Sequence, residues 1–314
     1  MYYPYFRGKQ FELVLLRERA GLIGSNAISP IIEFVRDNSS SARRVLRNLV
    51  DSEAKFTVIL NPLVGDLVGE QDTVLGFIDG VVPADYENMS LGYIVNRDTD
   101  IRDLREMIRA GDRENYAIIH YGHADGERIS AETNSSDRVK THIFIDKYTS
   151  RLYHRHFRKD GVRRVLIRDG FRIVRNEDYP PSEHFSDLHI TYTDDGMDGF
   201  GDFLIVGDEY REAGGPAFAV AIHLTYLDRE EDMFVMHFVS ERSGSPVDPA
   251  GKFQEALEKL VEELDRRGTL LFCSDACNEY RDLFESSHFP GLGYVKKLSM
   301  QHHLELLSDF LSRQ

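Results

Sequence analysis

Three carboxylic acids stand where a run of apolar residues ends, and these are the first candidates for chemistry. Glu33, Asp146 and Asp169 each close such a run. A carboxyl group at the end of an apolar run is partly withdrawn from water, which raises its pKa and suits it to proton transfer near neutral pH. We therefore take Glu33, Asp146 and Asp169 as candidate catalytic acids or bases.

Asp146 and Asp169 close consecutive runs, so their side chains would lie on neighbouring strands of a parallel sheet. Such a pair fits a general acid and base, or a Mg²⁺ ion whose coordination is completed by substrate oxygens. It also fits ion pairs with Arg168 and Lys147, which is the commonest outcome for acids beside basic residues. The sequence leaves these alternatives open, names no cofactor and does not require Mg²⁺.

A second set of polar residues could bind a ligand. Asn61, Asn96, His120 and Arg168 also end apolar runs. The cations of Arg7-Gly8-Lys9 precede an apolar-periodic helix over residues 11–22, with Glu12 in its first turn. Arg7 and Lys9 could fold over the site and hold an anionic small molecule.

Other kinds of site lack their signatures. His120 with His123, and His154 with His156, form no His-Glu-x-x-His pattern and have no clear third ligand. There is no Gly-x-Ser-x-Gly, and the only two cysteines, Cys273 and Cys277, have no obvious histidine partner. The sequence therefore predicts no metal site and no serine or cysteine nucleophile.

The elements that would position these residues are strands of continuous apolar character, as in parallel sheets buried between layers. Eight runs qualify, and residues 233–239 could pair with the last of them as a hairpin. The predicted strands cover residues 28–35, 56–61, 91–96, 116–121, 141–146, 162–169, 201–206 and 218–226.

Helical patterns separate most of these strands, including residues 42–50 after Asn38 and 101–109 after Asp98. Repeated strand–helix units with right-handed crossovers close into a barrel, whose ligand site lies at the carboxyl ends of the strands. We expect an α/β protein with a TIM-barrel-like (β/α)8 fold in one domain, residues 1–314. Its core strands would span about 28–240, and amphipathic helices over about 247–314 would form a C-terminal cap. No Gly-x-Gly-x-x-Gly follows the first run, which disfavours an open dinucleotide-binding sheet.

Composition limits the partners. The 314 residues include 38 Lys and Arg against 53 Asp and Glu, a net charge of −15, so long-range electrostatics oppose direct nucleic-acid binding. No segment approaches the length of a membrane span, and no leader with a cleavage site is evident. The sequence predicts a cytoplasmic protein without membrane contact.

Four segments, taken together, resemble a known family. Residues 3–9 with Glu12, residues 30–33, residues 200–205 and the run Ser299-Met300-Gln301-His302-His303 are similar to the phage and bacterial "beta protein" family. The similarity runs from end to end. That family is largely uncharacterised, its members resemble barrel proteins, and the bacterial ones tend to be encoded beside a nuclease. The resemblance implies that Arg7, Lys9, Glu12, Glu33 and Asp202 matter, although Asp202 would start its strand, away from the mouth.

Three functions follow as hypotheses. The first is a barrel that recognises a ligand or partner in a phage-defence or phage-related locus, with a neighbouring-gene nuclease as one partner. The second is a hydrolase or lyase for a phosphorylated or nucleotide-like small molecule, using Glu33 and Asp146 with Arg7, Lys9 and Arg168 as anion clamps. The third is an acidic inhibitor of a nuclease.

Overall fold

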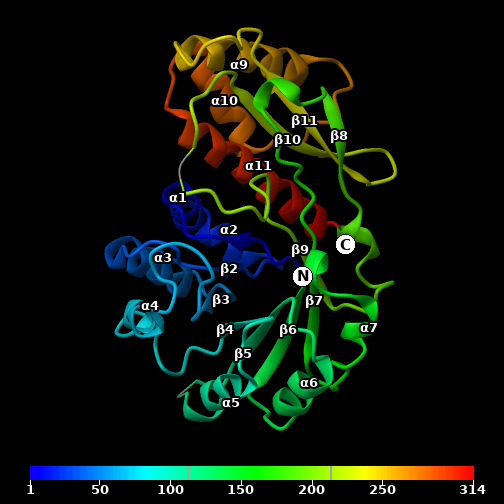
Figure 1. The fold of residues 1–314 in the computed structure, drawn as a ribbon. Coiled ribbons are helices and arrows are strands. Elements are labelled where there is room, and N and C mark those ends of the chain that lie inside the picture. The colour runs from blue at the N-terminus through cyan, green and yellow to red at the C-terminus, as the bar shows by residue number, and fades with distance from the viewer. Residues whose placement is uncertain (112, 213) are drawn as a thin grey trace. The chain divides into compact units, whose positions relative to one another are not determined.

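The chain forms two compact units in the computed structural model, which describes residues 1–111, 113–212 and 214–314 (Figure 1). The first unit contains Met1–Asp169 and Thr191–Asp202. The second contains Gly170–Ile190 and Phe203–Gln314. The sequence predicted one domain over residues 1–314, and whether the two units behave as one domain stays a prediction.

The first unit is built on a parallel sheet of eight strands that closes into a barrel. Its order is β1-β2-β3-β4-β5-β6-β7-β9. Closure comes from a parallel bridge between Tyr2 and Phe200 and from Tyr5 N–H, which donates to the carbonyl of Asp202 at 2.9 Å. The strands are β1 (Tyr5–Phe6), β2 (Ile31–Ile32), β3 (Phe56–Ile59), β4 (Met89–Asn96), β5 (Tyr116–Tyr121), β6 (Val139–Ile145), β7 (Arg163–Ile167) and β9 (Gly199–Gly201).

Helices follow most of these strands, and polar side chains cap several of their N-termini. Asn38, Asp100 and Asp125 accept hydrogen bonds from backbone N–H groups in the first turns of α3, α5 and α6. The helices of this unit are α1 (Gln10–Glu18), α2 (Ala20–Ser25), α3 (Ser39–Asp51), α4 (Gln71–Ile78), α5 (Ile101–Ala110), α6 (Gly126–Asn134) and α7 (Arg151–His154), and the short helix α8 (Leu188–Thr191) leads back into it.

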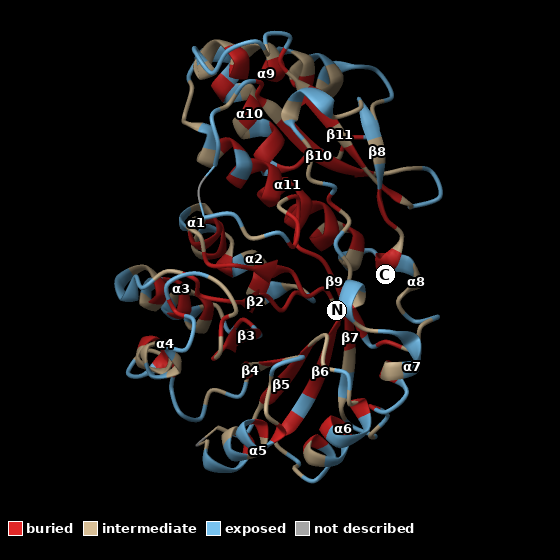
Figure 2. Ribbon diagram, viewed as in Figure 1, coloured by how far each residue is buried: buried red, intermediate tan, exposed pale blue. Residues whose placement is uncertain are grey.

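Burial explains why the barrel strands read as continuous apolar runs. Ile31, Val58, Ile118 and Ile119 are all 0% exposed, and Figure 2 shows the barrel strands as largely buried. Alternate residues of a strand face opposite sides, so both the barrel interior and the layer under the helices must be apolar. The TIM-barrel-like fold that the repeated strand–helix pattern predicted is therefore confirmed.

The second unit is an antiparallel sheet packed with helices. The sheet order is β10-β11-β8, with β10 (Ala221–Leu227), β11 (Met233–Val239) and β8 (Ser182–Ser186). Ile222 and Leu224 of β10 belong to one core with residues of the three C-terminal helices. Those helices are α9 (Pro249–Asp265), α10 (Asp275–Glu285) and α11 (Leu292–Ser312).

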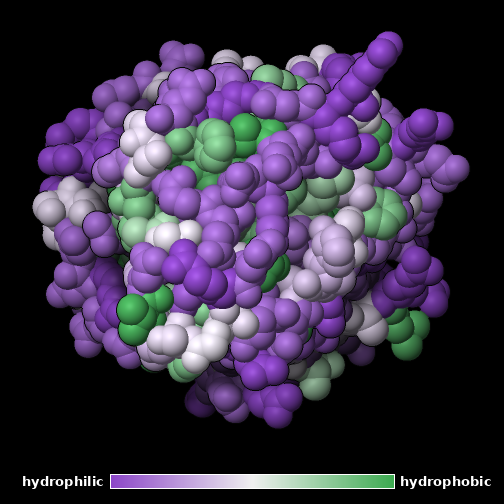
Figure 3. Space-filling view, turned by 90° about the horizontal axis from the view of Figure 1, so that it is seen from above, coloured by the Kyte–Doolittle hydropathy of each residue, from purple (hydrophilic) through white to green (hydrophobic). Residues whose placement is uncertain are grey.

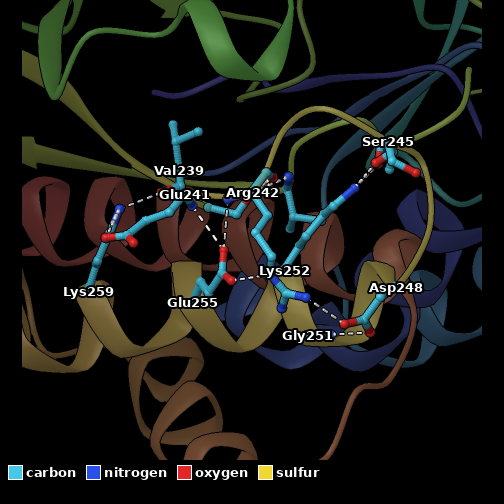
Figure 4. A network of polar contacts seen from close by, with 12 residues as sticks. Val239, Glu241, Arg242, Ser245, Asp248, Gly251, Lys252, Glu255 and Lys259 are labelled. Atoms are coloured by element: carbon cyan, nitrogen blue, oxygen red, sulfur yellow. Dashed lines mark hydrogen bonds and ion pairs between the residues drawn. The ribbon is translucent and has the colours of Figure 1, made fainter.

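Polar contacts fasten the loop before α9 to that helix (Figure 4). The Asp248 carboxylate accepts from Gly251 N–H at 2.9 Å and from Arg242 at 2.9 Å. Arg242 also pairs with Glu255, and Lys259 donates to the carbonyl of Val239 at 2.9 Å. The start of α9 is therefore held by a capping carboxylate and by the end of β11.

The strand prediction was wrong in three places. The barrel begins with Tyr5–Phe6, which the sequence did not identify as a strand, because two residues are too short to show a period. The predicted eighth strand, residues 218–226, instead forms β10 of the antiparallel sheet, paired with the hairpin partner Met233–Val239. The last barrel strand is Gly199–Gly201, earlier than the predicted 201–206.

The face drawn in Figure 3 is largely hydrophilic, and its hydrophobic side chains form small, separate groups. Such scattered apolar residues are normal on a protein surface. Within the described residues, no helix is both long and apolar enough to cross a membrane.

Candidate functional site

The barrel brings the predicted polar residues to one edge, because its strands are parallel and their carboxyl ends lie together. The residues that follow or end these strands form the mouth. They are Arg7 after β1, Glu33 after β2, Asn96 in β4, Tyr121 in β5, Asp146 after β6, Arg168 after β7 and Asp202 after β9.

Glu33 is the most enclosed of these groups, with 1% exposure. Its Oε2 accepts a hydrogen bond from the Tyr5 hydroxyl at 2.8 Å, and its Oε1 accepts from the backbone N–H of Leu63 at 2.8 Å. Arg7 Nε lies 3.5 Å from the same Oε2. A buried carboxylate is tolerated only when paired and hydrogen-bonded, and these three contacts supply both.

The chain around Arg7 is shaped to hold this group. Arg7 is 8% exposed, and its backbone N–H donates to the buried carboxylate of Glu12 at 2.6 Å. Gly8 has φ +59°, and a Cβ there would lie 3.1 Å from the carbonyl oxygen of Glu33. A glycine is therefore required in the turn from β1 to α1, because this turn lies against the backbone that follows β2. The sequence placed Glu12 in the first turn of the predicted helix, and in the structure its carboxylate binds the backbone N–H of Arg7.

Protonation in this group follows from burial. Burial raises the pKa of the Tyr5 hydroxyl well above its usual value, and Glu33 adds to the rise. Tyr5 therefore keeps its proton at neutral pH and donates a hydrogen bond to Glu33. Burial lowers the pKa of Lys9, with Arg7 and Arg36 acting in the same direction and Glu12 against them. Lys9 thus gives up its proton more readily than an ordinary surface lysine.

Asp202 lies at the carboxyl end of β9, not at the start of its strand as the sequence suggested. The correction follows from the shift of this strand to residues 199–201. Asp202 is 6% exposed, and its Oδ1 accepts from the Tyr2 hydroxyl at 2.8 Å. Burial, then Asp202, raise the pKa of Tyr2 well above its usual value, so this tyrosine is a fixed donor.

Asp146 and Arg168 form an ion pair across β6 and β7, with Arg168 Nε 2.7 Å from Asp146 Oδ2. This is one of the outcomes that the sequence left open for Asp146. Asp169 follows Arg168 and is exposed. No group of three or more His, Cys, Asp or Glu side chains in the described chain is arranged to hold a metal ion.

Glu33 and Asp146 lie on opposite sides of the barrel, because β2 and β6 are separated by three strands in the sheet order. The three predicted acids therefore do not form one catalytic group. Glu33 contacts Tyr5 and Arg7, whereas Asp146 forms its ion pair with Arg168.

The two asparagines hold the backbone. The side chain of Asn61 donates to the carbonyl of Ile94 at 2.9 Å and accepts from Ile94 N–H at 2.8 Å, so it extends the pairing of β3 to β4. Asn96 accepts from Asp98 N–H at 3.0 Å and shapes the turn into α5. These backbone contacts explain why each of the two strands ends in an asparagine, and neither contact requires a bound ligand.

His120 does not face the mouth, contrary to the interpretation of the sequence. Its Nδ1 lies 2.9 Å from the Tyr153 hydroxyl of α7, and its Nε2 lies 3.0 Å from Nδ1 of His142. Phe157 packs against its ring. His120 therefore points out of the barrel, into the layer between the strands and α7, because it lies next to Tyr121 and adjacent strand residues face opposite sides.

Sequence reasoning missed Tyr5 and Tyr2, the two hydroxyls that donate to Glu33 and Asp202. A signal was present, because Tyr2-Tyr3-Pro4-Tyr5-Phe6 is itself an apolar run that ends in the polar Arg7.

Comparisons with known proteins add little to this geometry. No family model matches the chain, and no curated protein matches it. A crystal structure of a Coccidioides immitis protein provisionally assigned to the dihydrodipicolinate synthase family resembles it with a TM-score of 0.42 and 7% sequence identity. The similarity covers 64% of this chain and 65% of that one, so the chain spans slightly less than two thirds of that protein. The likeness is too distant to transfer a substrate or a catalytic residue.

The resemblance to the "beta protein" family, the phage-related setting and the nuclease partner stay predictions. The barrel itself rests on its strand pairing.

Proposed function

We propose that the barrel is a hydrolase or lyase that acts at its mouth on a small anionic molecule, phosphorylated or nucleotide-like. The observation that carries this proposal is the buried group of Tyr5, Arg7 and Glu33 at the carboxyl ends of β1 and β2. Charges buried in this way stabilise a fold less well than apolar residues of similar size. Buried, hydrogen-bonded ionisable groups at the mouth of a barrel are typical of catalytic sites.

The roles follow from the contacts. Glu33 is the proton acceptor, held in place by Leu63 N–H and the Tyr5 hydroxyl. Tyr5 keeps its proton and steadies the carboxylate. Arg7 lies beside it. Arg7 and Lys9, two residues further along the chain, would bind the anionic part of the substrate, since guanidinium and ammonium groups suit phosphate oxygens.

The test compares how two variants and the wild type change a metabolite extract, followed by mass spectrometry. Glu33→Gln keeps the size of the side chain and removes its proton-accepting charge. Glu132→Gln is the control, because Glu132 forms an ion pair with Arg105 on the helices α5 and α6. We expect the wild type and the control to deplete the same compound, and Glu33→Gln to do so more slowly by a factor of about 10² to 10⁴.

Equal depletion by Glu33→Gln would remove the catalytic role of Glu33. A compound that binds all three proteins but is recovered unchanged would identify a recognition barrel instead. In that case the phage-related partner hypothesis predicts co-purification with the product of a neighbouring gene. Folding of each variant is checked by its thermal unfolding midpoint.

A further inference from the structure

The second unit contains a chain of polar side chains that crosses its antiparallel sheet. His223 of β10 and His237 of β11 are directly opposite each other in the register, and their Nδ1 atoms lie 2.7 Å apart. His237 Nε2 lies 3.2 Å from Glu183 Oε1 of β8. The other carboxylate oxygen of Glu183 accepts from Arg172 at 2.8 Å. The contacts run without a break from Arg172 to His223.

These contacts fix which ring nitrogens carry protons. A carboxylate accepts, so His237 Nε2 must donate to Glu183. In the neutral ring of His237, Nδ1 is then an acceptor. His223 Nδ1 must therefore donate to it, which leaves a lone pair on His223 Nε2. Glu183 therefore orients His237, and His237 in turn orients His223. A catalytic base is commonly oriented by an acid in the same way.

The outer nitrogen of His223 is available. Among the described residues none hydrogen-bonds His223 Nε2, and 9% of the residue is exposed. Phe171 and Tyr179 pack against the ring, with centroids 5.1 and 4.7 Å away. Tyr179 also stacks on His237 at 4.5 Å. The ring that carries this nitrogen thus contacts two aromatic side chains.

Burial keeps both histidines neutral at neutral pH. Burial lowers the pKa of His223 well below its usual value, and His237 and Lys296 of α11 act in the same direction. Burial lowers the pKa of His237 to about 4, against the opposite effect of Glu183. At neutral pH, His223 is therefore a free base and not an imidazolium ion.

We propose that His223 is the proton-accepting group of a second site, which takes small esters or related acyl compounds whose apolar part packs on Phe171 and Tyr179. His237 and Glu183 are positioning residues that hold its tautomer. The site lies wholly in the second unit and is independent of the function proposed for the barrel.

The reaction is hydrolysis assisted by a general base. His223 Nε2 takes a proton from a water molecule as the water oxygen bonds to the acyl carbon. The bond from that carbon to the ester oxygen then breaks, and the leaving alcohol takes the proton back from His223. The products are a carboxylic acid and an alcohol, and no oxidant or cofactor is consumed.

The test measures hydrolysis of p-nitrophenyl acetate by the full chain. We expect an excess over buffer in the wild type and in His288→Gln, a control at an exposed histidine. His223→Gln should lower that excess at least about tenfold, and His237→Phe should lower it as well, since the tautomer is no longer held. In the wild type the rate should stay level as the pH falls through 6.5 and decline only in more acidic solution.

Equal rates for His223→Gln and the wild type would overturn the proposal, as would a rate that halves near pH 6.5. If His223→Gln does not fold, diethyl pyrocarbonate labelling of the wild type decides, because this reagent reacts with accessible neutral imidazole. Labelled His223 supports the site, and unlabelled His223 refutes it. A loss of ester hydrolysis in His223→Gln belongs to the second unit, because His223 lies outside the barrel unit, and this separates the result from the test of the barrel.

Discussion

The hydroxyl of Tyr5 is the smallest feature on which the proposed barrel site depends. It donates to Glu33 at 2.8 Å inside a protein interior where Tyr5 is 2% exposed. Tyr5→Phe removes one of the donors to a buried carboxylate, and we expect a loss of about 1–3 kcal/mol in the free energy of unfolding. Chemical denaturation measures it.

The control for this prediction is Tyr86→Phe. The Tyr86 hydroxyl donates to the neutral carbonyl of Ala54 at 2.7 Å in a half-buried position, so its loss should cost less. An equal loss in both variants would show that the charge of Glu33 makes no difference to the bond.

At this scale the sequence predicted positions better than contacts. It identified Glu33, because an acid at the end of an apolar run is visible in one dimension, and it identified Arg7 as a cation before an apolar-periodic helix. It could not assign His120 to the outer layer, because the face of a strand residue depends on a register that one missed residue inverts. The partners Tyr5 and Leu63 lie 28 and 30 residues from Glu33, a separation that no local pattern reveals.

The turn from β1 into α1 is the element that sets Arg7 beside Glu33. Gly8 has φ +59° and lies against the backbone of Glu33 and Phe34. Gly69 has φ +81° with nothing within 4 Å of a built Cβ, so it shares the left-handed backbone and lacks the close contact. We expect Gly69→Ala to cost about 1 kcal/mol and Gly8→Ala clearly more, as measured by denaturant unfolding.

An equal loss in the free energy of unfolding for the two substitutions would mean that the backbone around Gly8 shifts to accommodate a Cβ without further loss of stability. A Gly8→Ala protein that is folded should also bind anionic ligands more weakly, because its Arg7 has moved relative to Glu33.

The elements also show why the strand count was right and its membership wrong. β9 is only Gly-Phe-Gly, and a Cβ on Gly201 would lie 2.0 Å from the carbonyl oxygen of Tyr3. The closure of the barrel therefore requires glycine at this strand. In a sequence, glycines indicate turns, so the pattern of β9 does not look like a strand. The longer run in β10 shows a stronger strand pattern than β9, although it belongs to the other sheet.

At the scale of the whole molecule, buried neutral histidines should make stability depend on pH. Burial lowers the pKa of His142 to about 3 and that of His154 to about 4, and also lowers the pKa values of His120, His223 and His302. The unfolded chain binds these protons near pH 6.5 and the folded chain only in stronger acid. Stability is therefore complete above about pH 6.5 and falls as the pH drops toward 4.

The measurement is the free energy of unfolding in denaturant at a series of pH values between 7 and 4. Each such histidine adds a slope of up to about 1.4 kcal/mol per pH unit within this range. His154→Gln should reduce the total slope by up to that amount, because glutamine can keep a hydrogen bond to Thr149 without titrating. His288→Gln, at an exposed position, should leave the slope as it is. A wild-type stability that is constant down to pH 4 would mean that these histidines take up protons in the folded chain, and that the layer around His120 and His142 admits water.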